Sequence, residues 1–441
     1  MTTGHYSQRR VVITGVGVVS PIGCTKDDFW QSLMEARSGI GALESASSGH
    51  SPGRCAGEVT QFRGHIDDFG DLDKAKKKAI RKALKLMNRE TQMAVAATQH
   101  ALGDSGLADD DVDPERSGVS YGAGYVSMMP QDFLDGIQSC TDSENEFDFS
   151  RWGSSGLEKM TPLWLLTCLP NMPACHISIY NDLRGPNNSI TQREAAANQA
   201  VAEASHIIAD GAADIMIAGA TGTNILPLNM LHTVMEQEVA DDAPDPTKLC
   251  RPFDRQRTGS VIGEAAATVI LEDFDSAVGR GAHIYGEVVG SGSNCAAAGH
   301  HAEKRSDAIA HAIKAALESA ATSADSVGHV HAHGLSGRLA DIEEARAVRQ
   351  VFGGKADTLP VVAAKSYTGN AGAGSGAVEL VASLLALEHG NLFPVLNYEQ
   401  PDPECPISPV TTTGVEAGSS FLNLSVVPQG QASCLLVRSV E

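Results

Sequence analysis

Short apolar runs that alternate with helix-forming segments, with glycine at the junctions, are the feature that most restricts how this chain can fold. Residues 9–21 combine a β-branched run with glycine and end in a turn, and Asp214–Ala220 is a second apolar run of strand length. Helical patterns occur at Arg89–Ser105 and at Glu194–Ala209. Runs that are apolar throughout indicate strands buried on both faces. The alternation therefore predicts an α/β fold with a buried, largely parallel sheet.

The same alternation begins again near Ile284. From there strands are expected at 284–290, 328–332 and 361–364, and helices at 306–321, 340–352 and 374–388. No clear sequence repeat accompanies it, so the prediction of two similar halves, residues 1–272 and 273–441, depends on element order alone. The polar, acidic segment at about 126–160 interrupts the first half and is expected to be irregular, as a lid, a partner contact or a plain surface loop.

Charge and cysteine usage exclude several classes of function. The 441 residues carry 33 Lys and Arg against 54 Asp and Glu, a formal charge of −21, which disfavours nucleic acid and anionic membranes as partners. No N-terminal segment resembles a signal peptide or a membrane span, so a cytoplasmic protein is expected. The nine cysteines lack zinc-ligand spacing, which predicts free thiols and no metal.

One basic segment stands out in this acidic chain. It can be the solvated face of a helix or a docking patch for an acidic partner. It comprises Lys74, Lys76, Lys77, Lys78, Arg81, Lys82 and Lys85.

A candidate site begins where a strand meets a helix. Gly185-Pro186 marks a turn, and Glu194 opens an alanine-rich helical run, so its carboxylate is expected near a helix N-terminus. Backbone N–H groups and the helix dipole favour negative charge there. The pattern leaves open whether Glu194 is catalytic, a structural plug or a cap.

Two more strand ends carry polar residues, which is where α/β folds place their chemistry. His333 follows one strand and can hydrogen-bond a carbonyl oxygen or transfer a proton, although a structural histidine has the same signature. Lys365 follows another, which suggests a buried ion pair with Glu379 or Glu344, and a surface lysine is the alternative.

Six stretches, in order and spanning nearly the whole chain, resemble the β-ketoacyl-acyl-carrier-protein synthases of the elongating, thiolase-fold type. The resemblance implies two thiolase-like halves in a five-layered α/β/α/β/α arrangement and a dimer, either a homodimer or a heterodimer with a cysteine-containing ketosynthase. It also implies an acyl chain on the phosphopantetheine of an acidic acyl carrier protein, with no further cofactor. Lys74, Lys77, Lys78, Arg81 and Lys82 are then the candidate carrier-protein patch. The stretches are RRVVITGVGVVSPIG, LRGPNNSIT, RPFDRQRTGSVIGE, HAHGLSG, AAKSYTGNAGAGSGAVE and NYEQPDPECP.

The chain departs from the family pattern where the chemistry is expected. The family's nucleophilic cysteine falls on Glu194, which cannot form a thioester. The first family histidine is kept as His333 and the lysine as Lys365, but the second histidine falls on Asn370, which does not titrate near neutral pH. The loop that gates the family's site and donates an oxyanion N–H matches Val426, Val427, Pro428, Gln429 and Gly430, and Pro428 has no N–H to give.

Three functions remain after these departures. The first is a subunit of type II fatty acid or polyketide biosynthesis without condensing activity, similar to a chain length factor and paired with an active ketosynthase. The second is an enzyme of altered chemistry, a decarboxylation or a proton transfer on carrier-bound acyl chains that uses Glu194 and His333. The third is a scaffold with no acyl ligand, which a pocket closed by Val426 and Pro428 would favour.

Overall fold

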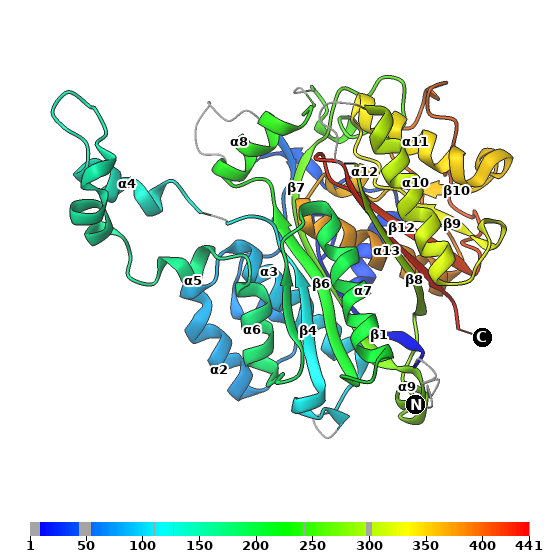
Figure 1. Cartoon of the computed structure of the whole chain (residues 1–441), viewed down its shortest axis with the longest axis horizontal. Helices are drawn as coiled ribbons and strands as arrows, with labels where there is room; N and C mark the ends of the chain where they lie inside the picture. Colours follow the sequence, from blue (N-terminus) through cyan, green and yellow to red (C-terminus); the bar gives the residue numbers. More distant parts are fainter. Residues whose placement is uncertain are drawn as a thin grey trace, which may run out of the picture.

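The computed structural model describes residues 9–43, 54–108, 111–126, 128–240, 243–296 and 302–440. Five strands of the N-terminal half lie in the order β1-β7-β6-β4-β5 within one long sheet (Figure 1). Their bounds are β1 Val11–Val19, β4 Ser117–Gly122, β5 Asn187–Ile190, β6 Ile215–Thr223 and β7 Ile262–Asp273.

The C-terminal half repeats this arrangement as β8-β13-β12-β9-β10, joined to the first half where β1 pairs with β8. In each half the first of these five strands lies next to the last, and the second and third lie farthest from the junction of the halves. The repeated order confirms the prediction of two similar halves, while the boundary at residues 272 and 273 stays a prediction. The bounds are β8 Gly286–Cys295, β9 His329–His331, β10 Pro360–Val362, β12 Ser420–Val426 and β13 Gln431–Arg438.

Strand direction is the part of the fold that the sequence did not predict correctly. The outer pairs β6–β4, β4–β5, β12–β9 and β9–β10 are parallel, but β1–β7, β7–β6, β8–β13 and β13–β12 are antiparallel. The sheet is therefore mixed rather than largely parallel. An apolar run reports burial on both faces, and in a layered fold antiparallel strands are buried in the same way as parallel ones.

Helices cover the sheet in the five layers expected for a thiolase-like fold. Helices α3 and α6 pack outside the first half, α10 and α11 pack outside the second, and α7 and α13 lie between the two halves (Figure 1). Gly376 allows the two central helices to approach closely, because a Cβ there would lie 3.1 Å from Cβ of Ala197. The bounds are α3 Arg89–Ser105, α6 Met172–Asn181, α7 Ala196–Ala209, α10 Ala302–Ser319, α11 Arg338–Phe352 and α13 Ser375–His389.

Smaller elements complete the body. Helix α3 has the bounds predicted from its pattern, and Gly106 follows it in the left-handed conformation. The remaining elements are α1 Lys26–Met34, α2 Lys74–Ala83, α8 Pro227–Glu236, α9 Phe274–Gly279, α12 Lys365–Thr368, β2 Ile40–Ala42, β3 Cys55–Gly57 and β11 Ser408–Pro409.

The acidic excursion forms an arm, residues 128–168, that extends away from the body on the side of β5 (Figure 1). It contains helix α4 (Gln131–Ser139), so the expectation of an irregular segment was wrong there. It ends in helix α5 (Trp164–Cys168), which lies beyond the predicted segment of about 126–160, and residue 127 lies outside the described residues. The ring of Phe133 lies 6.5 Å from that of Trp152 and 6.0 Å from that of Trp164. Scattered aromatic residues thus build a small core that polarity did not reveal.

Candidate active site

Four residues predicted from strand and helix ends are buried together between the halves. Glu194 lies in a 3-10 turn, Arg193–Ala195, that leads into α7, so the helix predicted from Glu194 begins with a tighter turn. His333 follows β9, Lys365 opens α12, and Asn370 follows α12. Each of the four is at most 4 % exposed.

The carboxylate of Glu194 is held by amide groups. Its Oε1 accepts hydrogen bonds from Nδ2 of Asn370 at 3.2 Å and from Nε2 of Gln237 at 3.3 Å. Its Oε2 has no hydrogen-bond partner among the described residues, and Nε of Arg193 lies 3.6 Å from it. Because no backbone N–H of the described chain donates to Glu194, the structure gives it no helix-capping contact. Gln237 carries no sequence signal, since it follows α8 outside any motif.

Asn370 has a fixed orientation. Its Oδ1 accepts from the backbone N–H of Gly372 at 3.1 Å and from Oγ of Ser375 at 3.2 Å. These two donors identify Oδ1 and therefore direct the Nδ2 group toward Glu194. Asn370, which the resemblance predicts at the position of the family's second histidine, is thus a neutral donor already bonded to a carboxylate.

His333 belongs to a chain of charged contacts. Nζ of Lys365 donates to Oε1 of Glu379, to the backbone oxygen of His333 at 2.8 Å and to Nδ1 of His333 at 3.1 Å. An ammonium group has only donors, so Nδ1 is the accepting nitrogen and the ring hydrogen is on Nε2. Burial, and then the charge of Lys365, hold the pKa of His333 well below its usual value. The imidazole is therefore neutral and keeps one N–H donor for a ligand.

The two carboxylates proposed for Lys365 have different roles. Glu379 is the ion-pair partner, and burial raises its pKa. Glu344 instead accepts the backbone N–H groups of His333 at 2.6 Å and Gly334 at 2.9 Å. Burial raises the pKa of Glu344 to about 8. Glu344 therefore positions the backbone that carries His333, and the sequence alone left this choice open.

The turn between β12 and β13 closes over His333. The N–H of Val427 donates to the backbone oxygen of Gln431 at 2.8 Å, so it is not free for an oxyanion, and Pro428 has no N–H. Val426, Val427 and Pro428 line, together with His333, a cavity of only about 30 Å³. One molecule occupies about this volume in liquid water.

A wider cavity of about 560 Å³ lies outside this small one. The two share Arg305, Leu335, Ala340 and Pro428, so the outer cavity narrows toward His333. The outer cavity is lined by Glu236, Gln237, Glu238, Arg305, Leu335, Gly337, Arg338, Leu339, Ala340 and Pro428.

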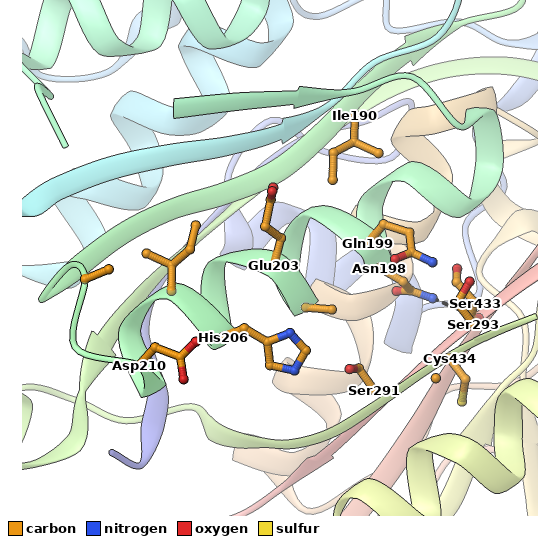
Figure 2. Close-up of a pocket in the computed structure, with 14 residues that line it drawn as sticks. Ile190, Asn198, Gln199, Glu203, His206, Asp210, Ser291, Ser293, Ser433 and Cys434 are labelled. Atoms are coloured by element: carbon orange, nitrogen blue, oxygen red, sulfur yellow. Dashed lines mark hydrogen bonds between the residues drawn. The ribbon is translucent and has the colours of Figure 1, made fainter. Parts of the chain in front are cut away.

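Another cavity, of about 470 Å³, lies along the outward face of α7 (Figure 2). Glu203, His206 and Asp210 follow one another along the helix there, with Ser291 of β8 opposite. None of Glu194, His333, Lys365 or Asn370 lines it. Its volume therefore does not mark the predicted site.

The predicted carrier-protein patch lies on α2, separate from the site. Lys74, Lys78, Arg81 and Lys82 are exposed, whereas Lys77 is partly buried and pairs with Asp67 at 2.5 Å. Four charges of the patch are therefore free to meet solvent or a partner.

All nine cysteines are free thiols. Within the part of the chain that the structure describes, no three His, Cys, Asp or Glu side chains are arranged to hold a metal ion. No helix there is long and apolar enough to span a bilayer.

Comparison with known families finds two matches that follow each other along the chain. Residues 8–277 match the β-ketoacyl synthase N-terminal domain, and residues 285–399 match the β-ketoacyl synthase C-terminal domain. Among curated relatives, 3-oxoacyl-acyl-carrier-protein synthase 2 of Synechocystis sp. is 33 % identical over 91 % of each chain. The granaticin polyketide putative β-ketoacyl synthase 1 of Streptomyces violaceoruber is 31 % identical over 92 % of this chain and 93 % of its own.

Solved structures give the same result. The ishigamide ketosynthase/chain length factor matches with a TM-score of 0.81 and 27 % identity, over 98 % of this chain and 100 % of its own. A type II polyketide synthase acyl carrier protein in complex with its ketosynthase bound to the hexaketide gives a TM-score of 0.82 and 26 % identity over the same shares.

Proposed function

The chain belongs to the β-ketoacyl synthase family of type II fatty acid and polyketide synthesis, and from that premise we propose that it is a partner subunit without condensing activity. Its partner would be a ketosynthase that keeps the nucleophilic cysteine, as in the ishigamide ketosynthase/chain length factor.

The state of the nucleophile position carries this proposal. Condensation needs a nucleophile that accepts the acyl group, and Glu194 presents a carboxylate already bonded to Asn370 and Gln237. Oxyanion donors are commonly worth a factor of about 10²–10³ each in rate, and the turn at Val427 and Pro428 supplies none. A cavity of about 30 Å³ beside His333 leaves no room for an acyl chain.

The surface supports a partner. Strand β5 is the last strand of the sheet, so its outer edge is unpaired within the described chain. The described chain exposes 15 large apolar side chains, and 13 of them lie between Tyr125 and Met235 in the sequence. They are on the arm, α6, α8 and the segment before the arm. Exposed apolar side chains and an open sheet edge are both typical of protein interfaces. We place the ketosynthase partner on this side.

Co-purification tests the proposal. Expressed with a cysteine-bearing ketosynthase of the same pathway, the chain should elute as a one-to-one complex. A stable homodimer that ignores the ketosynthase would overturn the partner role. In a condensation assay, Glu194→Cys with Asn370→His should stay inactive, because neither Val427 nor Pro428 has a free N–H for an oxyanion. Condensation by this double variant would show that nucleophile and base were the only missing parts.

An acyl carrier protein is the second proposed partner. A carrier protein occurs with its ketosynthase in a solved relative, and the exposed cations of α2 suit an acidic surface. Replacing Lys78, Arg81 and Lys82 by Glu should weaken carrier binding severalfold at low salt and little at high salt, as expected for exposed charges. If the variant binds the carrier protein as tightly as the unchanged protein at both salt concentrations, α2 is excluded as the docking site.

The alternative of an enzyme with altered chemistry gains no support from the geometry. Glu194 and His333 share no hydrogen bond in the described structure, and Nδ1 of His333 is occupied by Lys365. If Glu194 nevertheless acts as an acid or base, Glu194→Gln should abolish turnover of an acyl-carrier substrate. The small cavity equally fits a scaffold, which would bind no acyl-carrier protein at all.

A further inference from the structure

We propose that Arg193 controls access to Glu194 from the outer cavity of about 560 Å³. Its contacts with Glu236 and Gln429, here called the clasp, keep acyl chains away from Glu194. The inference rests on the proposed function, because a subunit that does not condense must keep the chain out of its own nucleophile turn. Neither the family match nor the sequence motifs assign a role to Arg193.

Three side chains from separate elements form the clasp. Nη1 of Arg193, in the turn before α7, contacts Oε2 of Glu236 at the end of α8 and Oε1 of Gln429 at 3.1 Å. Nε2 of Gln429, in the turn between β12 and β13, donates to Oε1 of Glu236 at 3.0 Å. Each member thus contacts the other two. A further bond of 3.0 Å from Gln431 to Gln192 joins the same two turns.

The surroundings of Arg193 hold it in the closed position. Its side chain is 11 % exposed, its guanidinium lies 5.0 Å from the ring centre of Tyr125, and its Nε lies 3.6 Å from Glu194. Its backbone has φ of 51°, a left-handed conformation that residues with a side chain rarely adopt. Such a conformation persists only where contacts on several sides maintain it.

The clasp stands between the outer cavity and the nucleophile turn. Glu236 and Gln237 line the cavity of about 560 Å³, and Gln237 is bonded to Glu194 behind it. We therefore expect a chain that enters from this cavity to meet Glu236, the partner of Arg193, and Gln237 on its way to Glu194. The clasp also ties down the turn whose Pro428 narrows the path to His333.

Alkylation of a reporter cysteine tests the proposal. Glu194→Cys places a thiol at the nucleophile position, and iodoacetamide labelling of each cysteine is followed by peptide mass spectrometry. Adding Arg193→Ala should speed labelling of residue 194 by roughly tenfold or more, as expected when hydrogen bonds between charged groups are lost. Adding Glu236→Gln should give a smaller increase. Arg184→Ala is the matched control, since Arg184 is an exposed arginine of the same half paired with Asp182.

Two native cysteines serve as internal references in every variant. Exposed Cys295 should label at a constant rate, and buried Cys434 should stay protected if the fold is intact. Equal labelling of residue 194 with and without Arg193 would overturn the proposal. If Arg193→Ala also exposes Cys434, the Glu236→Gln variant decides, and no increase there refutes the clasp. This assay needs no partner subunit, so its failure is distinguishable from failure of the co-purification.

Discussion

The two sides of the site differ in how their charges are satisfied. On the histidine side, Lys365 joins Glu379 and His333, and Glu344 holds the backbone of His333. On the nucleophile side, Glu194 faces the amides of Asn370 and Gln237, and its Oε2 has no hydrogen-bond partner within the described part of the chain. If the predicted correspondence holds, the histidine side keeps the family's histidine and lysine as His333 and Lys365, and the nucleophile side has Glu194 and Asn370 in place of the two reactive residues.

This difference predicts that the two sides contribute unequally to the stability of the fold. A buried ion pair is costly to break, because removing one partner leaves a charge in a medium of low polarity. The hydrogen bonds of Glu194 come from neutral amides, and its ion-pair contact with Arg193 is longer, at 3.6 Å, so we expect its interactions to be weaker. The buried ion pair therefore gives His333 and Lys365 a structural role, whereas Glu194 is held by fewer strong contacts. Retained His333 and Lys365 are not by themselves evidence of catalysis.

The largest effect is expected when the ion pair is broken. Lys365→Met leaves Glu379 buried without its cation and should lower the free energy of unfolding by about 3–5 kcal/mol, measured by urea denaturation. Adding Glu379→Leu should recover part of this loss. Lys78→Met, at an exposed lysine, should change stability by less than about 0.5 kcal/mol. A small effect of Lys365→Met would remove the contrast between the two sides.

An intermediate effect is expected from the titration of Glu344. Burial raises its pKa to about 8 in the folded chain, against about 4.3 in an unfolded one. The folded state therefore binds this proton more tightly, so the stabilisation is complete below the unfolded pKa and is lost as pH rises through the folded pKa.

Glu344→Gln isolates this contribution, because glutamine has no proton to lose. Its stability relative to the unchanged protein should rise with pH between the unfolded and folded pKa values of Glu344, as followed by urea denaturation at several pH values. Parallel pH profiles for the two proteins would mean that Glu344 does not titrate in this window.

The smallest effect is expected at the nucleophile position. Glu194→Gln keeps the shape and one accepting oxygen, and Arg193 retains Glu236, so the free energy of unfolding should change by less than about 1 kcal/mol. Glu194→Leu, which removes the acceptor, serves as the comparison. A loss near that of Lys365→Met would identify Glu194 as a structural plug and break the proposed difference between the sides.

Local patterns predicted the elements that carry the site but not its contacts. Alanine-rich residues after Glu194 predicted α7, and the glycine after Ser105 predicted the end of α3. Strand direction was mispredicted, because apolar runs do not encode it. The helices of the arm were missed, since their aromatic contacts join residues that are far apart in an acidic segment.

By itself, the sequence determined the family, the two halves and the absence of a cysteine at residue 194, because these depend on residue identity and order along the chain. Tertiary structure alone decided that Lys365 pairs with Glu379 rather than Glu344, that Gln237 and Arg193 surround Glu194, and that Gln429 reaches Glu236. The Gln429–Glu236 contact forms only because the two halves pack together, and the Lys365–Glu379 and Gln237–Glu194 contacts join separate elements of one half that only folding brings within hydrogen-bonding distance.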